Sequence, residues 1–484
     1  MYIAVSLGLF VYGVNWYYLT ARWRRLRKSR APVPRALHSQ PKVTVQLPVY
    51  NERYVAARLL AAVAAFDWPH DLLEIQVLDD SDDDTTDLLA RSVSHLQSRG
   101  FDVHHLRRGS RSGFKAGALA YGLTRASGNF MAIFDCDFFP PPEFLKRVMP
   151  EFEDPQVGLV QTRWGHLNAE YSPLTRAEAI GVDGHFAVEQ EVRYRLGYLM
   201  NFNGTAGVWR RACIEAAGGW GSDTLAEDLD LSYRAQLRGW RSVYRKDVVC
   251  PAELPAQITA FKRQQFRWAK GSIQVFLKLR ERIRDSALTR GQRAEAYLHL
   301  SLYVVHPLML ISFLLVPPLL LLGGIHPFVP ALFATASLGP ASMYIASQWE
   351  FHPTDWKRRL LSLPFLTVVG AGLSLNNSRA VVEAVLKRRS EFLRTPKFGL
   401  EGRRGTWRGS RYALRGTGET VAEIAFAGYG IAGAALAVAS DNWWALPWTA
   451  LFAAGFLTVA ALSVLHSIAA VDPGKDGVPD AASP

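Results

Sequence analysis

Cysteine is scarce in this chain. Its 484 residues include three, Cys136, Cys213 and Cys250, which stand far apart. They show neither the paired spacing of a zinc site nor the framework of a disulfide-rich secreted fold. No nucleic-acid-binding motif is evident either. The sequence therefore gives no support to a disulfide-stapled domain or a zinc module, and it fits a central domain in a reducing compartment.

Charge is almost missing from long parts of the chain and concentrated in others. Residues 40–290 have the composition of a soluble domain, whereas the first twenty residues and most of 296–470 are strongly apolar. The net charge is +12, and many basic residues lie beside apolar runs, as at 22–28, 357–359 and 387–389. This placement is typical of the positive-inside rule and favours a membrane protein over a nucleic-acid-binding protein.

Apolar stretches long enough to cross a bilayer lie on both sides of the central domain. Residues 1–21 precede their basic cluster, which is the reverse of a signal peptide. We therefore expect an uncleaved anchor with its N-terminus outside and the central domain in the cytoplasm. Further spans are expected at 298–322 and 329–346, within 296–348, and at 421–440 and 444–465, within 419–468. The polar tail, 471–484, is expected to be disordered.

The segment 361–375 is short for a span, and basic clusters flank it on both sides. A full crossing would place Lys387, Arg388 and Arg389 outside, against the positive-inside rule. We interpret 355–400 as a re-entrant or interfacial segment, which leaves five spans; a sixth span is the alternative.

The central domain alternates short β-rich runs with helical segments. The runs are 43–48, 74–78, 101–106 and 129–134, separated by helical segments at 54–66, 85–97 and 115–125. This alternation predicts an α/β domain with a mixed, mostly parallel sheet and helices on both faces. Ligands of such sheets bind beyond the C-terminal strand ends, which is where two acidic motifs fall.

These two motifs are Asp79-Asp80 and Asp135-Cys136-Asp137. Carboxylates two residues apart at a strand end can offer oxygen ligands to Mg²⁺ or Mn²⁺, which often share them with a diphosphate. A solvated turn is the alternative for the second motif. For the first, the alternative is a cap for the helix that starts at Thr85.

Two further motifs follow in the chain. Glu227-Asp228 stands at a helix start, where a carboxylate can act as a general base or simply cap the helix. Gln264-x-x-Arg267-Trp268 combines a flat ring for a sugar with a guanidinium for a diphosphate. An amphipathic helix at the membrane surface is the alternative.

In this order the four motifs resemble those of the processive family 2 glycosyltransferases, the cellulose, chitin, hyaluronan and mannan synthases. The resemblance covers about residues 43–400. The stretches 113–119, 161–164 and 202–210 look most like the cellulose-synthase-like A and C branches. The resemblance implies a GT-A-type nucleotide-sugar-binding domain joined to an α-helical transmembrane bundle.

The resemblance also implies roles for individual residues. Asp79 and Asp80 would contact the nucleotide, Lys115 would lie near the base or diphosphate, and Asp135 and Asp137 would form the D-x-D motif, with Asp137 as the direct ligand of Mg²⁺ or Mn²⁺. Asp228 would be the catalytic base, next to Glu227. The other substrate-binding residues would be Gln264, Arg267, Trp268 and Trp164, with Thr395 and Lys397 from a segment that resembles the F-x-V-T-x-K gating motif. Arg394 replaces the Val of that motif, which puts nucleotide gating in doubt.

The expected function is an inverting, processive transfer from a nucleotide-sugar that builds a β-1,4-linked hexose polymer and extrudes it through the membrane. GDP-mannose, giving mannan or glucomannan, and UDP-glucose, giving a β-glucan, are the candidate donors; the partners are the donor, the growing polysaccharide and membrane lipid. A non-processive enzyme that adds one sugar to a lipid phosphate is one alternative. A catalytically silent protein that binds or exports a polysaccharide is another.

Overall fold

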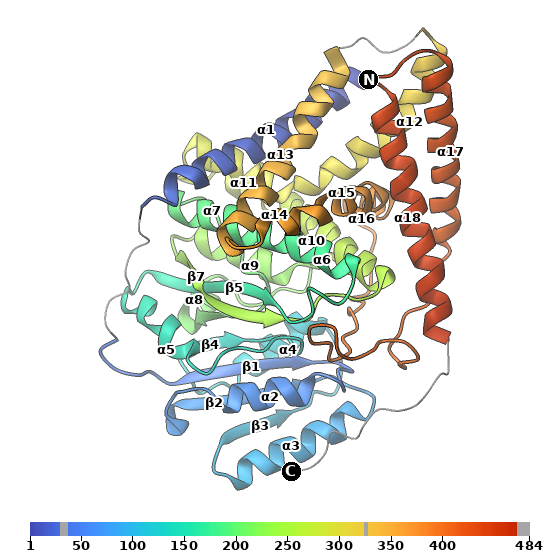
Figure 1. Cartoon of the computed structure of the whole chain (residues 1–484). Helices are drawn as coiled ribbons and strands as arrows, with labels where there is room; N and C mark the ends of the chain where they lie inside the picture. Colours follow the sequence, from blue (N-terminus) through green and yellow to red (C-terminus); the bar gives the residue numbers. More distant parts are fainter. Residues whose placement is uncertain (30–36, 324–327, 472–484) are drawn as a thin grey trace.

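The computed structural model describes residues 1–29, 37–323 and 328–471, except the side chains of 328–334. A sheet domain forms one end of the molecule and long apolar helices form the other, with shorter helices packed between them (Figure 1).

The central sheet is mixed and mostly parallel. Its strands are β1 Val43–Val49, β2 Leu73–Asp79, β3 Asp102–Leu106, β4 Phe130–Ile133, β5 Val157–His166, β6 Gly207–Arg210 and β7 Arg241–Ala252. Their order is β3-β2-β1-β4-β6-β5-β7, and β6 is antiparallel to both of its neighbours. All seven residues of β2 are buried, the polar Glu74, Gln76 and Asp79 included, because both faces of the strand are covered. The predicted α/β fold is confirmed.

Helices cover both faces of the sheet. One face packs against α2 Ala56–Ala64, α3 Thr85–Ser98 and α5 Phe144–Val148. The other packs against α4 Phe114–Leu123, α8 Arg211–Ala216 and α9 Glu227–Gln236. Because β1 pairs in parallel with both β2 and β4, the ends of those two strands, with their acidic motifs, lie on the same edge.

A middle layer joins the sheet to the apolar helices (Figure 1). It consists of α6 Pro173–Gly184, a π-helical turn His185–Gln190, α7 Glu191–Leu196, α10 Ile258–Arg284 and α11 Arg290–Leu300. The α10 helix carries the Gln264-x-x-Arg267-Trp268 motif over the strand ends.

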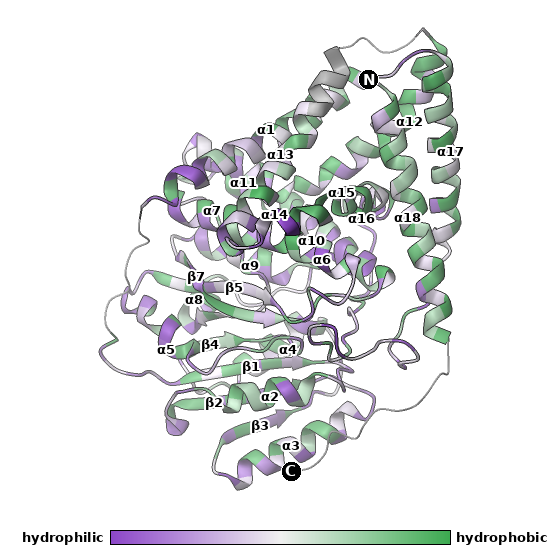
Figure 2. Ribbon diagram, in the orientation of Figure 1, coloured by the Kyte–Doolittle hydropathy of each residue, from purple (hydrophilic) through white to green (hydrophobic). Residues whose placement is uncertain are grey.

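The long apolar helices are α1 Tyr2–Leu26, α12 Val305–Leu321, α13 Phe328–Phe351, α17 Glu419–Ala439 and α18 Leu446–Val471. Among the described residues, four segments are long and apolar enough to cross a membrane: Tyr2–Leu26, Leu302–Leu321, Glu419–Ala439 and Leu446–Val471. Figure 2 shows α12, α17 and α18 hydrophobic over most of their length.

Two predicted spans differ in detail from the helices observed. The expected start at residue 298 was wrong, because 298–300 belong to α11, where His299 Nδ1 lies 2.7 Å from the Tyr233 hydroxyl. The expected span 329–346 lies within α13, and its side chains up to residue 334 are outside the described residues.

The segment expected to be re-entrant or interfacial forms α14 Trp356–Arg359, α15 Leu363–Gly372 and α16 Ser374–Val385. The helical axis bends by 45° between Trp356–Gly372 and Ser374–Val385. In Figure 1 these helices lie at the level of α6 and α10, at an angle to α17 and α18. Their relation to the bilayer stays a prediction. Residues 472–484 of the expected disordered tail are outside the described residues.

Helices α1 and α13 approach each other closely. A Cβ atom on Gly13 would lie 2.4 Å from the Ala336 Cα, and one on Gly339 would lie 2.5 Å from the Gly13 carbonyl oxygen. Contacts this short leave no room for a side chain, so the crossing depends on glycine, as is common between membrane helices.

Candidate active site

A cavity of about 210 Å³ opens at the carboxyl ends of β1 and β4, beneath α10. It is lined by all of the predicted site residues except Asp79: Asp80, Lys115, Asp135, Asp137, Trp164, Glu227, Asp228, Gln264, Arg267, Trp268, Thr395 and Lys397. The fold therefore gathers in one pocket side chains that are as far apart in the sequence as Asp80 and Lys397.

Asp79 lies behind the cavity wall and is 1% exposed. Its carboxylate accepts a hydrogen bond from the Ser81 amide at 2.9 Å and lies 2.9 Å from His105 Nε2. Burial alone would raise the pKa of Asp79, but these hydrogen bonds hold it below its ordinary value. Its contact with a nucleotide stays a prediction. In the structure, its carboxylate stabilises the turn after β2 through the hydrogen bond from the Ser81 amide.

Asp80 does face the cavity. Its two carboxylate oxygens receive Arg108 Nε and Nη2 at 2.7 and 2.5 Å. The bidentate pair fixes the carboxylate at the rim of the pocket.

Asp135 and Asp137 follow β4, and each carboxylate is paired with a lysine. Lys115 Nζ binds Asp135 Oδ1 and the Gly204 carbonyl oxygen, the latter at 3.0 Å. Lys397 Nζ lies 2.8 Å from Asp137 Oδ2. Burial alone would lower the pKa of both lysines, but the facing carboxylates raise it. Both ammonium groups are therefore charged. Each one lies against a carboxylate oxygen that a metal ion could otherwise bind.

These two carboxylates are the residues that could hold a metal ion. Among the described residues, no group of three or more His, Cys, Asp and Glu side chains converges as a preformed metal site. A pair of oxygen ligands fits Mg²⁺ or Mn²⁺ when the remaining positions are filled by a diphosphate and water.

Asp228 is the second residue of α9 and faces the same cavity. Burial and the neighbouring carboxylate of Glu227 raise its pKa to about 7. The chain passes close to it at Gly204, where φ is +82° and a Cβ atom would lie 2.8 Å from Asp228 Oδ2. A carboxyl group with this pKa is suited to taking up a proton near neutral pH.

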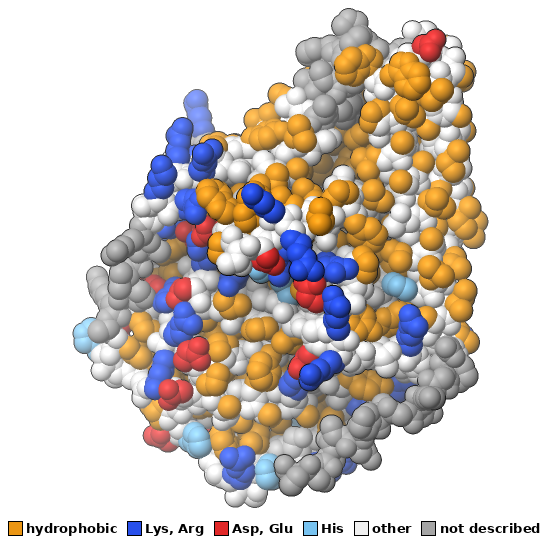
Figure 3. All heavy atoms as spheres, viewed as in Figure 1, with side chains coloured by type: hydrophobic (Ala, Val, Ile, Leu, Met, Phe, Trp, Pro, Cys, Tyr) orange, Lys and Arg blue, Asp and Glu red, His pale blue; other side chains and the backbone are white. Residues whose placement is uncertain are grey.

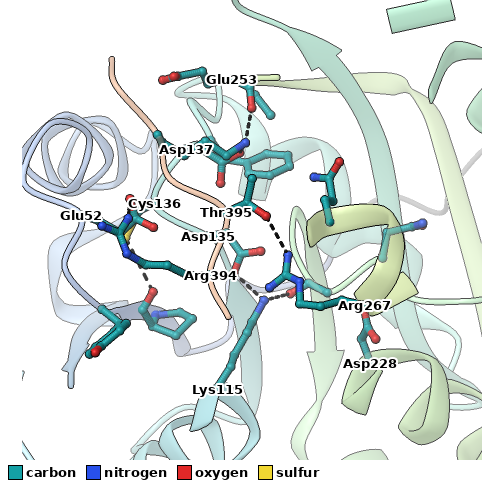
Figure 4. Close-up of a pocket in the computed structure, with 18 of the residues that line it drawn as sticks. Glu52, Lys115, Asp135, Cys136, Asp137, Asp228, Glu253, Arg267, Arg394 and Thr395 are labelled. Atoms are coloured by element: carbon teal, nitrogen blue, oxygen red, sulfur yellow. Dashed lines mark hydrogen bonds and ion pairs between the residues drawn. The ribbon is translucent and has the colours of Figure 1, made fainter. Parts of the chain in front are cut away.

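The α10 motif contacts the segment 392–397 across the cavity. Arg267 Nη2 donates to Thr395 Oγ1 at 3.2 Å, and its guanidinium lies 4.5 Å from the centre of the Phe392 ring. Figure 4 shows Arg394 and Thr395 on a stretch of chain that crosses the pocket, with Asp135, Lys115 and Arg267 gathered below Thr395. The predicted placement of Thr395 and Lys397 at the acidic motifs is therefore found in the structure.

Two buried glutamates that the sequence analysis missed hold this crossing segment. Glu253, directly after β7, accepts the backbone N–H groups of residues 398, 399 and 400 at 2.8, 2.9 and 3.1 Å. Glu52 forms an ion pair with Arg394 at 3.2 Å, although burial raises its pKa to about 8. Neither residue belongs to a motif, so only the fold reveals them.

His166 and Asn203 also line the cavity and were missed. His166 Nε2 lies 2.9 Å from one carboxylate oxygen of the buried Asp183, and the other oxygen accepts from Gln348 of α13 at 3.0 Å and lies 3.2 Å from His352, the residue after α13. The network ties the cavity wall to an apolar helix.

Comparison with known families identifies the chain. Residues 41–271 match the family described as glycosyltransferase-like family 2, and residues 214–346 match the cellulose synthase family. The chain therefore contains a glycosyltransferase-like family 2 region, which is overlapped and continued by a cellulose synthase region. The resemblance seen in its motifs is confirmed.

Its relatives include plant members of this family. The chain is 43% identical over 244 residues to glucomannan 4-beta-mannosyltransferase 2 of Arabidopsis thaliana, covering 49% of this chain and 46% of that protein. It is 41% identical over 283 residues to the probable glucomannan 4-beta-mannosyltransferase 7 of Oryza sativa subsp. japonica, covering 57% and 48%. The chain thus spans about half the length of the curated relatives it matches.

A solved structure resembles this chain in fold. The mannosyltransferase PcManGT from Pyrobaculum calidifontis, in complex with GDP-Man and Mn²⁺, superposes with a TM-score of 0.56 at 24% identity, covering 80% of this chain and 100% of that one. The sheet domain has the GT-A fold that the sequence predicts.

Proposed function

We propose that this chain is an inverting, processive membrane glycosyltransferase that polymerises a β-1,4-linked mannan or glucomannan from GDP-mannose. The observation that carries the proposal is the shared cavity. One pocket brings a carboxyl group with a pKa near 7, a D-x-D pair and the Gln264-x-x-Arg267-Trp268 motif together beneath apolar helices.

Asp228 is the general base of the proposed reaction. The acceptor hydroxyl, at O4 of the chain end, attacks the anomeric carbon of the donor sugar as the bond from that carbon to the diphosphate breaks. Asp228 takes the hydroxyl proton, and the nucleoside diphosphate leaves. A single displacement inverts the configuration, so an α-linked donor gives a β-linkage without a covalent sugar–enzyme intermediate.

Basic side chains receive the diphosphate. Asp135 and Asp137 would hold Mg²⁺ or Mn²⁺, which neutralises phosphate charge when bound. Arg267 and Lys115 line the same cavity and are placed to bind the leaving oxygens. Lys397 contacts the Asp137 carboxylate and the Glu253 backbone carbonyl oxygen. It would become available to a phosphate once the Asp137 carboxylate is neutralised by a metal ion.

The polymer would leave over Trp268 and Trp164 toward the apolar helices. Both rings line the cavity, and α10 connects it to the membrane end of the molecule. Extrusion would begin at this point, since the growing end stays in the pocket while the product lengthens.

Contacts at the helix ends support five spans, with the catalytic domain cytoplasmic and the N-terminus outside. At the end of α13, Glu350 pairs with Lys246 of the sheet domain at 2.8 Å. At the end of α18, His466 Nδ1 accepts from the Ile258 amide at 3.0 Å. The α1 helix also ends in a basic cluster on this side, as the positive-inside rule requires.

Asp228→Asn tests the proposed base. We expect polymer synthesis from labelled donor in membranes to fall by about 10²- to 10⁴-fold, with nucleotide affinity retained. Asp223→Asn is the matched control, because Asp223 is an exposed acid outside the cavity that pairs with Lys278 at 2.8 Å. Normal synthesis by the Asp228→Asn enzyme would end the assignment.

The donor is tested by incubating membranes with labelled GDP-mannose or UDP-glucose and digesting the product with a mannanase or a cellulase. The proposal expects a long product from GDP-mannose that the mannanase degrades. Incorporation of a single sugar would indicate a non-processive enzyme. Consumption of neither donor, with intact glycan binding, would indicate a silent export protein.

A further inference from the structure

A second hollow lies where α18 meets the sheet domain, outside the catalytic cavity. It encloses about 1360 Å³ and combines α18 residues 465–469 and 471 with loop residues 406–408, 415 and 416 and with Tyr171, Ser172 and Ala256. None of these residues lines the cavity described above. The α18 helix is a candidate span, so this hollow opens at the membrane edge on the side of the catalytic domain.

One wall of the hollow is basic. Arg408 and Arg415 are both exposed there, and no carboxylate lines the hollow among the residues that the structure describes. His466 Nδ1 accepts from the Ile258 amide, so the proton of the neutral ring lies on Nε2, which leaves a further donor. The wall thus offers positive charge and hydrogen-bond donors, which complement a phosphate group.

The opposite wall is apolar and unusually exposed. Leu465 is 59% exposed, Ile468 66% and Val471 54%. These residues continue the apolar surface of α18, and Figure 3 shows hydrophobic side chains over most of the surface of α17 and α18. A hollow with a basic wall and an apolar wall matches a lipid, whose head group is anionic and whose chains are hydrocarbon.

The base of the hollow is well packed. Trp407 is buried with Ala256, Phe398 and Leu400 in one apolar cluster, and its ring lies 5.1 Å from that of His466 in an edge-to-face arrangement. The Gly416 amide donates to Ser467 Oγ at 2.5 Å, which joins the loop to α18. The two walls are therefore held together before any ligand arrives.

We propose that this hollow binds an anionic phospholipid, with the phosphate between Arg408 and Arg415 and the acyl chains along Leu465, Ile468 and Val471. The site is independent of the proposed transfer reaction, since it shares no lining residue with the catalytic cavity.

The test measures phosphatidylglycerol retained by the purified full-length protein, using native mass spectrometry after equilibration in nanodiscs of phosphatidylcholine and phosphatidylglycerol. Each Arg near an anionic lipid contributes about fivefold to binding, so Arg408→Ala with Arg415→Ala should weaken retention roughly 25-fold. Arg403→Ala with Arg404→Ala is the matched control: it removes the same charge from the same loop at two exposed residues outside the hollow.

Retention by the control double variant at the wild-type level, together with rescue by Arg408→Lys with Arg415→Lys, supports the proposal and excludes unfolding as the cause of loss. Equal losses in the two alanine double variants would overturn it, because they would reflect general surface charge. Displacement of the lipid by millimolar inorganic phosphate would also overturn it, since the ligand would then be a free phosphate.

Discussion

The Lys397 ammonium group lies against the Asp137 carboxylate, where it competes with a metal ion. Removing this positive charge should make the protein bind Mn²⁺ more tightly in the absence of donor. Its Nζ lies 2.8 Å from Asp137 Oδ2, and the two side chains are only 8% and 15% exposed. Lys397→Met keeps most of the side-chain volume and removes the charge. Asp137 would then lack its nearest counter-charge and would attract a divalent cation more strongly.

The size of the effect follows from the geometry. Two unit charges about 4 Å apart attract by ~4 kcal/mol at an effective dielectric constant of ~20. A cation that binds Asp137 displaces the ammonium group, which keeps its second contact with the Glu253 carbonyl oxygen. If about half of the attraction is lost in the exchange, the lysine costs a competing cation ~2 kcal/mol, or roughly 30-fold in affinity.

Electron paramagnetic resonance of free Mn²⁺ during titration of the purified protein measures this affinity without activity. Lys146→Met is the matched control, because Lys146 pairs with Asp67 at 2.5 Å on the surface, far from the cavity in the fold. We expect Lys397→Met to bind Mn²⁺ roughly 30-fold more tightly and Lys146→Met to match the wild type. Unchanged or weaker binding by Lys397→Met would refute the competition between lysine and metal.

Three further predictions concern the base and two glycines. Asp228 must be ionised to accept a proton, and its pKa is raised to about 7, so kcat/KM measured from about pH 5 to about pH 9 should rise with pH through about 7; a flat profile across this range would contradict this. Gly204→Ala should abolish most polymer synthesis, because the added Cβ would crowd Asp228. Gly239→Ala is the control: its φ is also positive but nothing lies within 4 Å of the added Cβ, so it should lose only about 1 kcal/mol of stability. Equal activities of the two variants would count against the Gly204–Asp228 contact. Gly13→Ala should lower the melting temperature in detergent, because the added Cβ would separate α1 from α13. Gly428→Ala on α17, where nothing lies within 4 Å of the added Cβ, should leave the melting temperature unchanged. Identical melting curves for the two variants would argue against the close crossing.

Local pattern was enough to predict the alternating part of the fold. Each of the four expected strands overlaps an observed one, since runs such as Val43–Val49 are rich in β-branched and apolar residues, with an apolar face of valine and leucine that helices must cover. The antiparallel β6 strand was not anticipated. Its four residues are too few for a periodic signal, and their pairing with β4 and β5 is decided by tertiary packing.

The candidate site divides in the same way. The acidic motifs at strand ends and the aromatic motif on α10 were predicted from their spacing in the sequence, and the cavity brings them together. Glu52 and Glu253 could not be found from spacing, because an isolated glutamate in a sequence carries no sign of its burial. Asp79 illustrates the opposite case: its motif marks the right strand end, yet its hydrogen bonds turn it away from the cavity.

The three amide hydrogen bonds that Glu253 receives hold the chain that crosses the catalytic cavity. With residues 398–400 fastened to the sheet domain and Arg394 paired with Glu52, the chain is fixed on both sides of Thr395 and Lys397. Any ligand of Asp137 must therefore compete with a lysine whose backbone is anchored before and after it.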